Sequence, residues 1–194
     1  MSNAFFSPLA TDPPDWEHKA QLTLSCMTRS NALQKKVEEN EWLTKRANWK
    51  SIDSVLLPDF PRMTEDDLKD LTLGSYQVQL ASEYTNQQLK KTSPYQIQIH
   101  KEEAEENIIR VKIGSRMSTH NCHTAWIQYI PYAVGPKSIA GRVCNCKVGN
   151  RMVGMCAHLC SAIWYLSHAR HRNFSPRSYE LAREIMNAAD IIGA

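Results

Sequence analysis

The sequence predicts an α+β fold with a helical N-terminal part, a three-stranded antiparallel meander and a cysteine-rich loop packed on a helix. Three observations predict it. Apolar residues recur at helical spacing in the first half of the chain, and three later segments alternate apolar with polar residues. Finally, CNCKVGNRMVGMCAHLC, residues 144–160, holds four cysteines and one histidine. A chain of 194 residues that is 42% hydrophobic is long enough for one or two domains with a buried core.

The helical part is predicted over residues 30–92. Residues 1–29 contain three prolines and little periodicity, so we expect them to be irregular. Ser30 then opens SNALQKKVEENEWLTKRANW, whose apolar residues fall at near-helical spacing among charges and predict an amphipathic helix. Thr64 opens TEDD, an N-cap signal, and the helical pattern reaches about Leu89 with Gly74 as a possible break between two helices.

The meander is predicted from three alternating segments, at 95–99, 109–113 and 125–129. The acidic turn KEEAEEN joins the first two. The second strand places Arg110 and Lys112 on one face, which is either solvated or part of a basic surface. A helix is expected to follow the cysteine-rich segment as far as about residue 170, and SPRSYELAREIMNAADII predicts a short helix in the C-terminal segment 173–194.

The charge of +3 is divided unevenly along the chain. Residues 1–106 carry 12 Lys and Arg against 17 Asp and Glu, whereas residues 107–179 carry ten Lys and Arg and no acid. A stretch without carboxylates makes no local ion pairs, so we expect it either to face an anionic partner or to be compensated by the acidic half of the chain. No run of about 18 uncharged apolar residues and no signal peptide is present, which favours a soluble intracellular protein with no membrane partner.

The cysteine-rich segment predicts a zinc site. Cys144 and Cys146 are separated by one residue, so on an extended strand their side chains share a side. Cys156 and His158 repeat this gap at the start of the predicted helix, and Gly149 and Gly154 allow the positive φ that a tight return requires. Three thiolates and one imidazole complete a tetrahedral Zn²⁺ shell, as structural sites do.

The remaining sulfur and imidazole groups are interpreted as structural. Cys160, four residues after Cys156, is expected to be a small core residue, although ligation by it is a second reading. The pairs His120 with His123 and His168 with His171 have no cysteines in register and are expected to be exposed.

We expect the metal to be structural and the protein not to be an enzyme, with no small-molecule substrate. A catalytic zinc site keeps one position open for water and has a nearby carboxylate as general base. Here four ligands fill the shell, and no Asp or Glu occurs between Asn107 and Tyr179. Zinc binding can instead contribute about 10–16 kcal/mol to the folding of small peptides.

The pattern C-x-C, nine residues, C-x-H resembles the SWIM-type zinc finger. The strings GRVCNCKVGNRMVGMCAHLCSAIWYLSHARH, YQIQIHKEEAEENIIRVKIGSR and MTEDDLKDLTLGSYQVQLASEYT are similar to the C-terminal region of animal DDE-type transposase-like proteins, over about residues 30–172. The resemblance implies a SWIM-type domain over 93–172, with its zinc core at 139–170 and Cys144, Cys146, Cys156 and His158 as ligands. It also implies nuclear localisation. DDE transposases cut DNA with three carboxylates on an RNase H-like fold, and no such set is present here, so a transposase-derived protein without its catalytic domain is expected.

Two functions are compatible with these features. The first is a nucleic-acid-binding module, for DNA in preference to RNA, that contacts backbone phosphates with little sequence preference. The candidate cations flank the metal site or end the following helix: Arg142, Lys147, Arg151, Arg170 and Arg172. Four aromatic residues are candidates for stacking on bases, Trp126, Tyr129, Tyr132 and Trp164, with Trp164 more typical of a core position. The second function is a protein-interaction module in which the helical region binds a partner.

Overall fold

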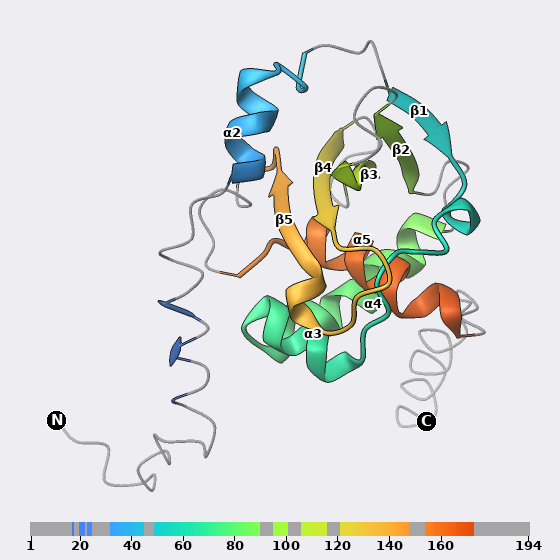
Figure 1. The fold of residues 1–194 in the computed structure, drawn as a ribbon. Coiled ribbons are helices and arrows are strands. Elements are labelled where there is room, and N and C mark those ends of the chain that lie inside the picture. The colour runs from blue at the N-terminus through green and yellow to red at the C-terminus, as the bar shows by residue number, and fades with distance from the viewer. Residues whose placement is uncertain are drawn as a thin grey trace, which may run out of the picture.

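The computed structural model describes residues 32–44, 49–89, 95–100, 106–115, 121–147 and 154–172, together with residues 17, 20, 21, 23 and 24. Over these residues the chain is an α+β fold built on one antiparallel sheet (Figure 1). The helix predicted within 173–194 lies outside the described residues, as do His120, Gly149 and Arg151. Most of the segment 1–29 also lies outside them, and the five residues described there are helical, contrary to the predicted irregular structure.

The sheet has five strands whose spatial order follows the chain. They are β1 (Trp49–Ile52), β2 (Gln96–His100), β3 (Ile108–Gly114), β4 (Cys122–Tyr129) and β5 (Ile139–Cys144). The three predicted strands are confirmed as β2, β3 and β4. The prediction of a three-stranded sheet is wrong, because β1 and β5 extend it on either side. The outer strands escaped prediction because β1 has only four residues and lies inside the region predicted to be helical, while β5, IAGRVC, contains a glycine and lacks a clear alternation.

Four α-helices accompany the sheet in the described residues: α2 (Ala32–Glu39), α3 (Glu65–Thr72), α4 (Ser75–Leu89) and α5 (Ala157–Ser167). Thr64 caps α3 through a reciprocal capping box, in which its hydroxyl accepts from Asp67 N at 3.1 Å and Asp67 Oδ2 accepts from Thr64 N at 2.9 Å. Leu73 adopts a left-handed conformation with φ of 61°, and Gly74 N donates to Lys69 O. The predicted cap and the predicted break near Gly74 are both confirmed.

The sheet buries both of its faces. Ile109, Val111 and Ile127 belong to a large core shared with α3, α4 and α5, and α4 and α5 lie side by side below the strands in Figure 1. Ile108 and Trp126, adjacent to these residues along β3 and β4, belong to a second core on the opposite face. That second core comprises Leu33, Val37, Trp42, Trp49, Ile108, Trp126 and Val143, and α2 covers it.

Gly141 allows α2 to approach β5 closely. A Cβ atom at position 141 would lie 3.0 Å from Leu33 Cβ, tighter than ordinary van der Waals contact. The glycine thus brings the second core against the strand that ends at Cys144.

The strand face that carries Arg110 is not a solvated basic face at this residue. Arg110 is only 7% exposed, its guanidinium lies 4.4 Å from the centroid of the Trp49 ring, and its Nε donates to Gln98 Oε1 at 2.8 Å. Burial lowers the pKa of Arg110. This cation serves to join β2, β3 and the tryptophan cluster, because the ring face and the amide oxygen replace part of its hydration.

Among the described residues, no helix is long and apolar enough to span a bilayer.

Candidate metal centre

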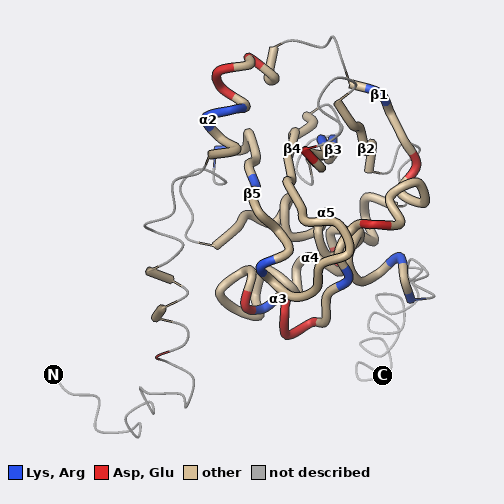
Figure 2. Tube along the Cα trace, viewed as in Figure 1, with Lys and Arg blue, Asp and Glu red and all other residues tan. Residues whose placement is uncertain are grey.

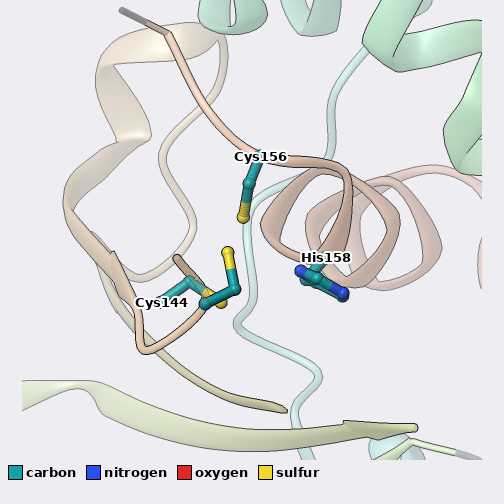
Figure 3. A group of neighbouring side chains, drawn as sticks. Cys144, Cys156 and His158 are labelled. Atoms are coloured by element: carbon teal, nitrogen blue, oxygen red, sulfur yellow. The ribbon is translucent and has the colours of Figure 1, made fainter. Parts of the chain in front are cut away.

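Cys144, Cys146, Cys156 and His158 form a single cluster that could hold a metal ion. Their candidate ligand atoms all lie within 4.8 Å of one another, and the three cysteines are buried. In Figure 3 the labelled side chains of Cys144, Cys156 and His158 converge between the end of β5 and the first turn of α5. Ligands about 2.3 Å from a tetrahedral ion lie about 3.8 Å apart. A contraction of about 1 Å at the widest pair would therefore close the shell.

The first half of the site is a short turn held by the neighbouring strand. Cys144 ends β5, and Asn145 follows with its backbone N donating to Thr124 O at 3.0 Å. The Asn145 side chain also turns to β4, where Oδ1 accepts from Thr124 N at 2.9 Å. These two bonds fix the residue between Cys144 and Cys146 on β4, so both thiols are free to face the cluster.

The second half is the N-terminus of α5. Cys156 is the N-cap residue, with extended backbone angles and no side-chain capping bond, and His158 lies in the first turn. The prediction that this pair falls at the start of the helix is confirmed. An N-cap cysteine places its sulfur beside unpaired backbone N–H groups, which stabilise a thiolate.

Gly154 and Arg142 hold this helix start against α3. Gly154 has φ of 95°, and a Cβ there would lie 2.6 Å from Thr72 O, so only glycine fits. Arg142 Nη2 donates to Gly154 O at 3.1 Å and to Leu71 O at 3.4 Å. The guanidinium thus joins β5, the end of α3 and the loop that leads to Cys156 through two neutral carbonyl groups.

The thiols of Cys144 and Cys156 differ in pKa in the absence of a metal. A hydrogen bond from Cys144 lowers the pKa of Cys156 to about 4, and His158 and the backbone N–H of Leu159 act in the same direction against burial. The same bond, together with burial, raises the pKa of Cys144. One thiolate is therefore already favoured in the cluster, and a divalent cation would supply the charge that stabilises the others.

His158 has the environment of a ligand rather than of a core histidine. Its Nδ1 is buried and has no hydrogen-bond partner among the described residues. Tyr84 of α4 packs edge-on against its ring at 5.4 Å between centroids, and the His123 ring of β4 lies at 4.1 Å. A buried nitrogen without a partner costs about 1–3 kcal/mol. The imidazole and the three thiols nevertheless offer ligand atoms within one cluster, so the residues present fit a metal ion.

The other sulfur and imidazole groups take different positions. Cys160 is fully buried and its Sγ contacts Gln77 O at 3.2 Å, outside the four-residue cluster, as expected of a core residue. His123 of β4 contacts the ring of His158, and no local pattern predicts this contact because the two residues are distant in the chain. His168 is 5% exposed and its Nδ1 lies 3.0 Å from Met63 O, so its predicted exposure was wrong.

The predicted nucleic-acid contacts have unequal environments. Lys147 and Arg172 are exposed, while Arg142 and Arg170 are half-buried and donate to backbone carbonyl groups. Lysine and arginine positions are distributed over several elements in Figure 2. Trp126 and Tyr129 are buried, so stacking on bases is wrong for them, and Trp164 is buried as its core interpretation predicted. Tyr132 is 79% exposed and is still available.

Comparison with known proteins adds no family assignment. No protein-family model, no curated protein and no solved structure matches the chain. The metal-binding interpretation therefore depends on the Cys₃His cluster itself.

Proposed function

We propose that the chain binds one Zn²⁺ ion through Cys144, Cys146, Cys156 and His158, and that the ion is structural. The convergence of the four ligand atoms carries the proposal. Three sulfur ligands and one imidazole favour zinc over magnesium or calcium, which prefer oxygen. Four protein ligands leave no position for water, so we propose no catalytic role.

Native mass spectrometry of the full chain, with and without a strong chelator, tests this assignment. We expect one zinc per chain, lost on chelation and absent from Cys156→Ser. Cys122→Ser is the matched control, because Cys122 is exposed and lies outside the cluster. A folded chain that binds no zinc, or a Cys156→Ser variant that retains it, would exclude the site.

We further propose that the zinc-stabilised domain binds nucleic acid, DNA in preference to RNA, in a nuclear, transposase-derived protein of the SWIM type. The acid-free stretch 107–179, with its ten Lys and Arg, supports this proposal. A zinc centre of three thiolates and a neutral imidazole carries a charge of −1, which leaves the stretch strongly positive. Exposed Lys147 next to Cys146 and exposed Arg172 are the best-placed contacts to phosphate.

Salt dependence tests the nucleic-acid proposal. Fluorescence anisotropy with a labelled duplex should show affinity falling steeply between about 50 and 200 mM salt, because each phosphate contact releases counterions. Lys147→Gln should weaken binding to all sequences to a similar degree. Lys69→Gln is the control, since Lys69 is paired with Asp66 on α3. Absence of binding at 50 mM salt would contradict the proposal.

A protein-interaction module is the second candidate. α4 already buries Val78, Ala81 and Tyr84 in the main core, so its apolar face is occupied. The connection between β4 and β5 instead exposes three apolar side chains close together in sequence, Ile130, Tyr132 and Val134. Binding of a protein partner that changes little with salt and is lost in Tyr132→Ser would favour this candidate.

A further inference from the structure

We propose that a pocket at the C-terminal end of α5 binds the terminal phosphate of a nucleotide. The pocket has a volume of about 550 Å³ and lies between the short 3₁₀ segment η1 (Ser54–Leu56), the end of α4 and the 3₁₀ segment η4 (Ala169–His171). Its size is within the range of small-ligand sites. The 11 residues of α5 span about 16 Å, so the pocket is separate from the metal centre at the other end of the helix.

The polar part of the pocket is cationic. Arg62, Arg170, His171 and Arg172 line it, and no Asp or Glu is among its described lining residues. Desolvation lowers the pKa of His171, and the positive charges of Arg170 and Arg62 lower it further, so the positive charge of the pocket is that of its three guanidinium groups. These cations come from two segments of the chain more than 100 residues apart, so their proximity results from the fold. An anion in the pocket would be attracted by all of them at once.

Arg170 is fixed in position but not neutralised. Its Nη2 donates to Leu57 O at 2.7 Å, its Nη1 donates to Ser54 O, and its Nε donates to His171 Nε2 at 3.2 Å. All three acceptors are uncharged, so no hydrogen bond pairs the half-buried guanidinium with a carboxylate, and the nearby Asp59 charge offsets only part of its positive potential. Arg62 and Arg172 are exposed and form no ion pair with any carboxylate of the described chain, which leaves both able to donate to phosphate oxygens.

The remaining wall suits an organic group attached to the phosphate. Tyr165 lines the pocket beside Leu57 and Leu89, and its ring is stacked on Tyr95 with centroids 5.2 Å apart. Its hydroxyl lies 3.5 Å from Ser54 Oγ, and both oxygens belong to lining residues. A rigid aromatic ring with apolar neighbours fits a nucleobase or sugar, while the hydroxyl groups and the arginines fit phosphate. A phosphate monoester with an aromatic group is therefore the matching ligand class.

Calorimetric titration of the zinc-loaded full chain with thymidine 5′-monophosphate tests the proposal. We expect binding of the monophosphate and none of thymidine. The double variant Arg62→Gln/Arg172→Gln should lose about tenfold or more in affinity, because charge-assisted hydrogen bonds are removed. Lys137→Gln, an exposed cation outside the pocket lining, is the control and should bind as the wild type does. Two results would overturn the proposal. One is no measurable binding at about 10 mM monophosphate, a concentration that detects even very weak affinity. The other is equal affinity of the double variant and the wild type.

Two short oligonucleotides identify the source of the phosphate. A thymidine tetramer with a 5′-phosphate that binds more tightly than both the monophosphate and the 5′-hydroxyl tetramer would assign the pocket to strand ends. Equal binding of the monophosphate and the phosphorylated tetramer would assign it to free nucleotides. If both tetramers bind equally and the double variant does not change their affinity, the pocket does not bind the terminal phosphate. That result would leave the proposed salt-dependent binding of duplex DNA unaffected.

Discussion

The two ends of α5 hold two sites of opposite construction. At the N-terminal end, three buried thiols and one imidazole converge, all from within 15 residues of the sequence. At the C-terminal end, exposed or half-buried cations converge from segments more than 100 residues apart. The first site offers negative charge to a cation and the second offers positive charge to an anion. A short motif can therefore encode a metal centre, whereas an anion pocket of this kind forms only when distant segments pack together.

At both ends of α5 an arginine side chain donates hydrogen bonds to two backbone carbonyl groups. Arg142 donates to Leu71 O and Gly154 O beside the metal centre, and Arg170 donates to Ser54 O and Leu57 O beside the pocket. Each guanidinium replaces the hydration of two carbonyl groups that lie at the end of a helical segment or in the adjoining loop. At the metal end this bracing positions a ligand, and at the pocket end it leaves a fixed positive charge.

Removing zinc should have the largest effect. When free zinc exceeds its dissociation constant about 1,000-fold, binding stabilises the fold by about 4 kcal/mol. For a chain of this size, that corresponds to a fall in melting temperature of about 8–16 °C on chelation. Thermal unfolding with and without chelator measures it, and Cys156→Ser should be insensitive to chelator. If the chelator lowers the melting temperature of the wild type and of Cys156→Ser equally, the stabilising zinc is not bound at this cluster.

Gly154→Ala should have the second largest effect. The substitution adds a Cβ atom 2.6 Å from Thr72 O at a positive φ, so the loop must shift and move Cys156. We expect a loss of about 1–3 kcal/mol in the free energy of unfolding, together with weaker zinc binding in competition with a chelating dye.

Gly135→Ala is the control for Gly154→Ala, because it introduces the same kind of backbone strain without moving the metal ligand Cys156. Gly135 also has a positive φ, of 76°, but its nearest contact would be Asp67 Oδ1 at 3.6 Å. This control should lose stability and keep the wild-type zinc affinity. Equal zinc affinities in both variants would show that the Gly154 loop does not position Cys156.

Arg142→Gln should destabilise the metal end by about 1–3 kcal/mol, because the carbonyl groups of Leu71 and Gly154 lose a charged donor. Lys147→Gln, at an exposed position, should change the free energy of unfolding by less than about 0.5 kcal/mol while weakening nucleic-acid binding. Urea unfolding and duplex titration of both variants measure the two effects. If Lys147→Gln proves the more destabilising, the bracing role of Arg142 is wrong.

Asp59→Asn should have the smallest effect, and it is a gain. Burial lowers the pKa of Arg170, whereas the Tyr165 phenol and the negative charge of Asp59 raise it, so the Asp59 carboxylate offsets part of the pocket's positive charge. Asparagine can still accept the 3.1 Å hydrogen bond from Tyr129 Oη. We expect the affinity for thymidine monophosphate to rise about two- to threefold, by the magnitude of a partly screened charge pair. An unchanged or lower affinity would contradict the electrostatic account of the pocket.

The extent of the sheet shows where sequence reasoning reached its limit. β2, β3 and β4 were predictable because apolar and polar residues alternate along them. β1 and β5 were not, because a four-residue strand and a glycine-containing strand carry little periodic signal. The environment of Arg110 was also not predictable, because an arginine in an alternating strand is expected to face solvent. The tryptophan cluster that covers it comes from other segments of the chain.

The sequence by itself determined the three central strands, the capped helix at Thr64, the break near Gly74 and the four candidate ligands. These features depend on residues within a few positions of one another, so local conformational preference and spacing suffice to specify them. The tertiary structure alone decided that Arg142 braces the metal centre, that His123 and Tyr84 contact His158, and that Arg62 meets Arg170 and Arg172 at one pocket. These contacts join segments that are distant in the chain, and only the packing of both sheet faces brings them together.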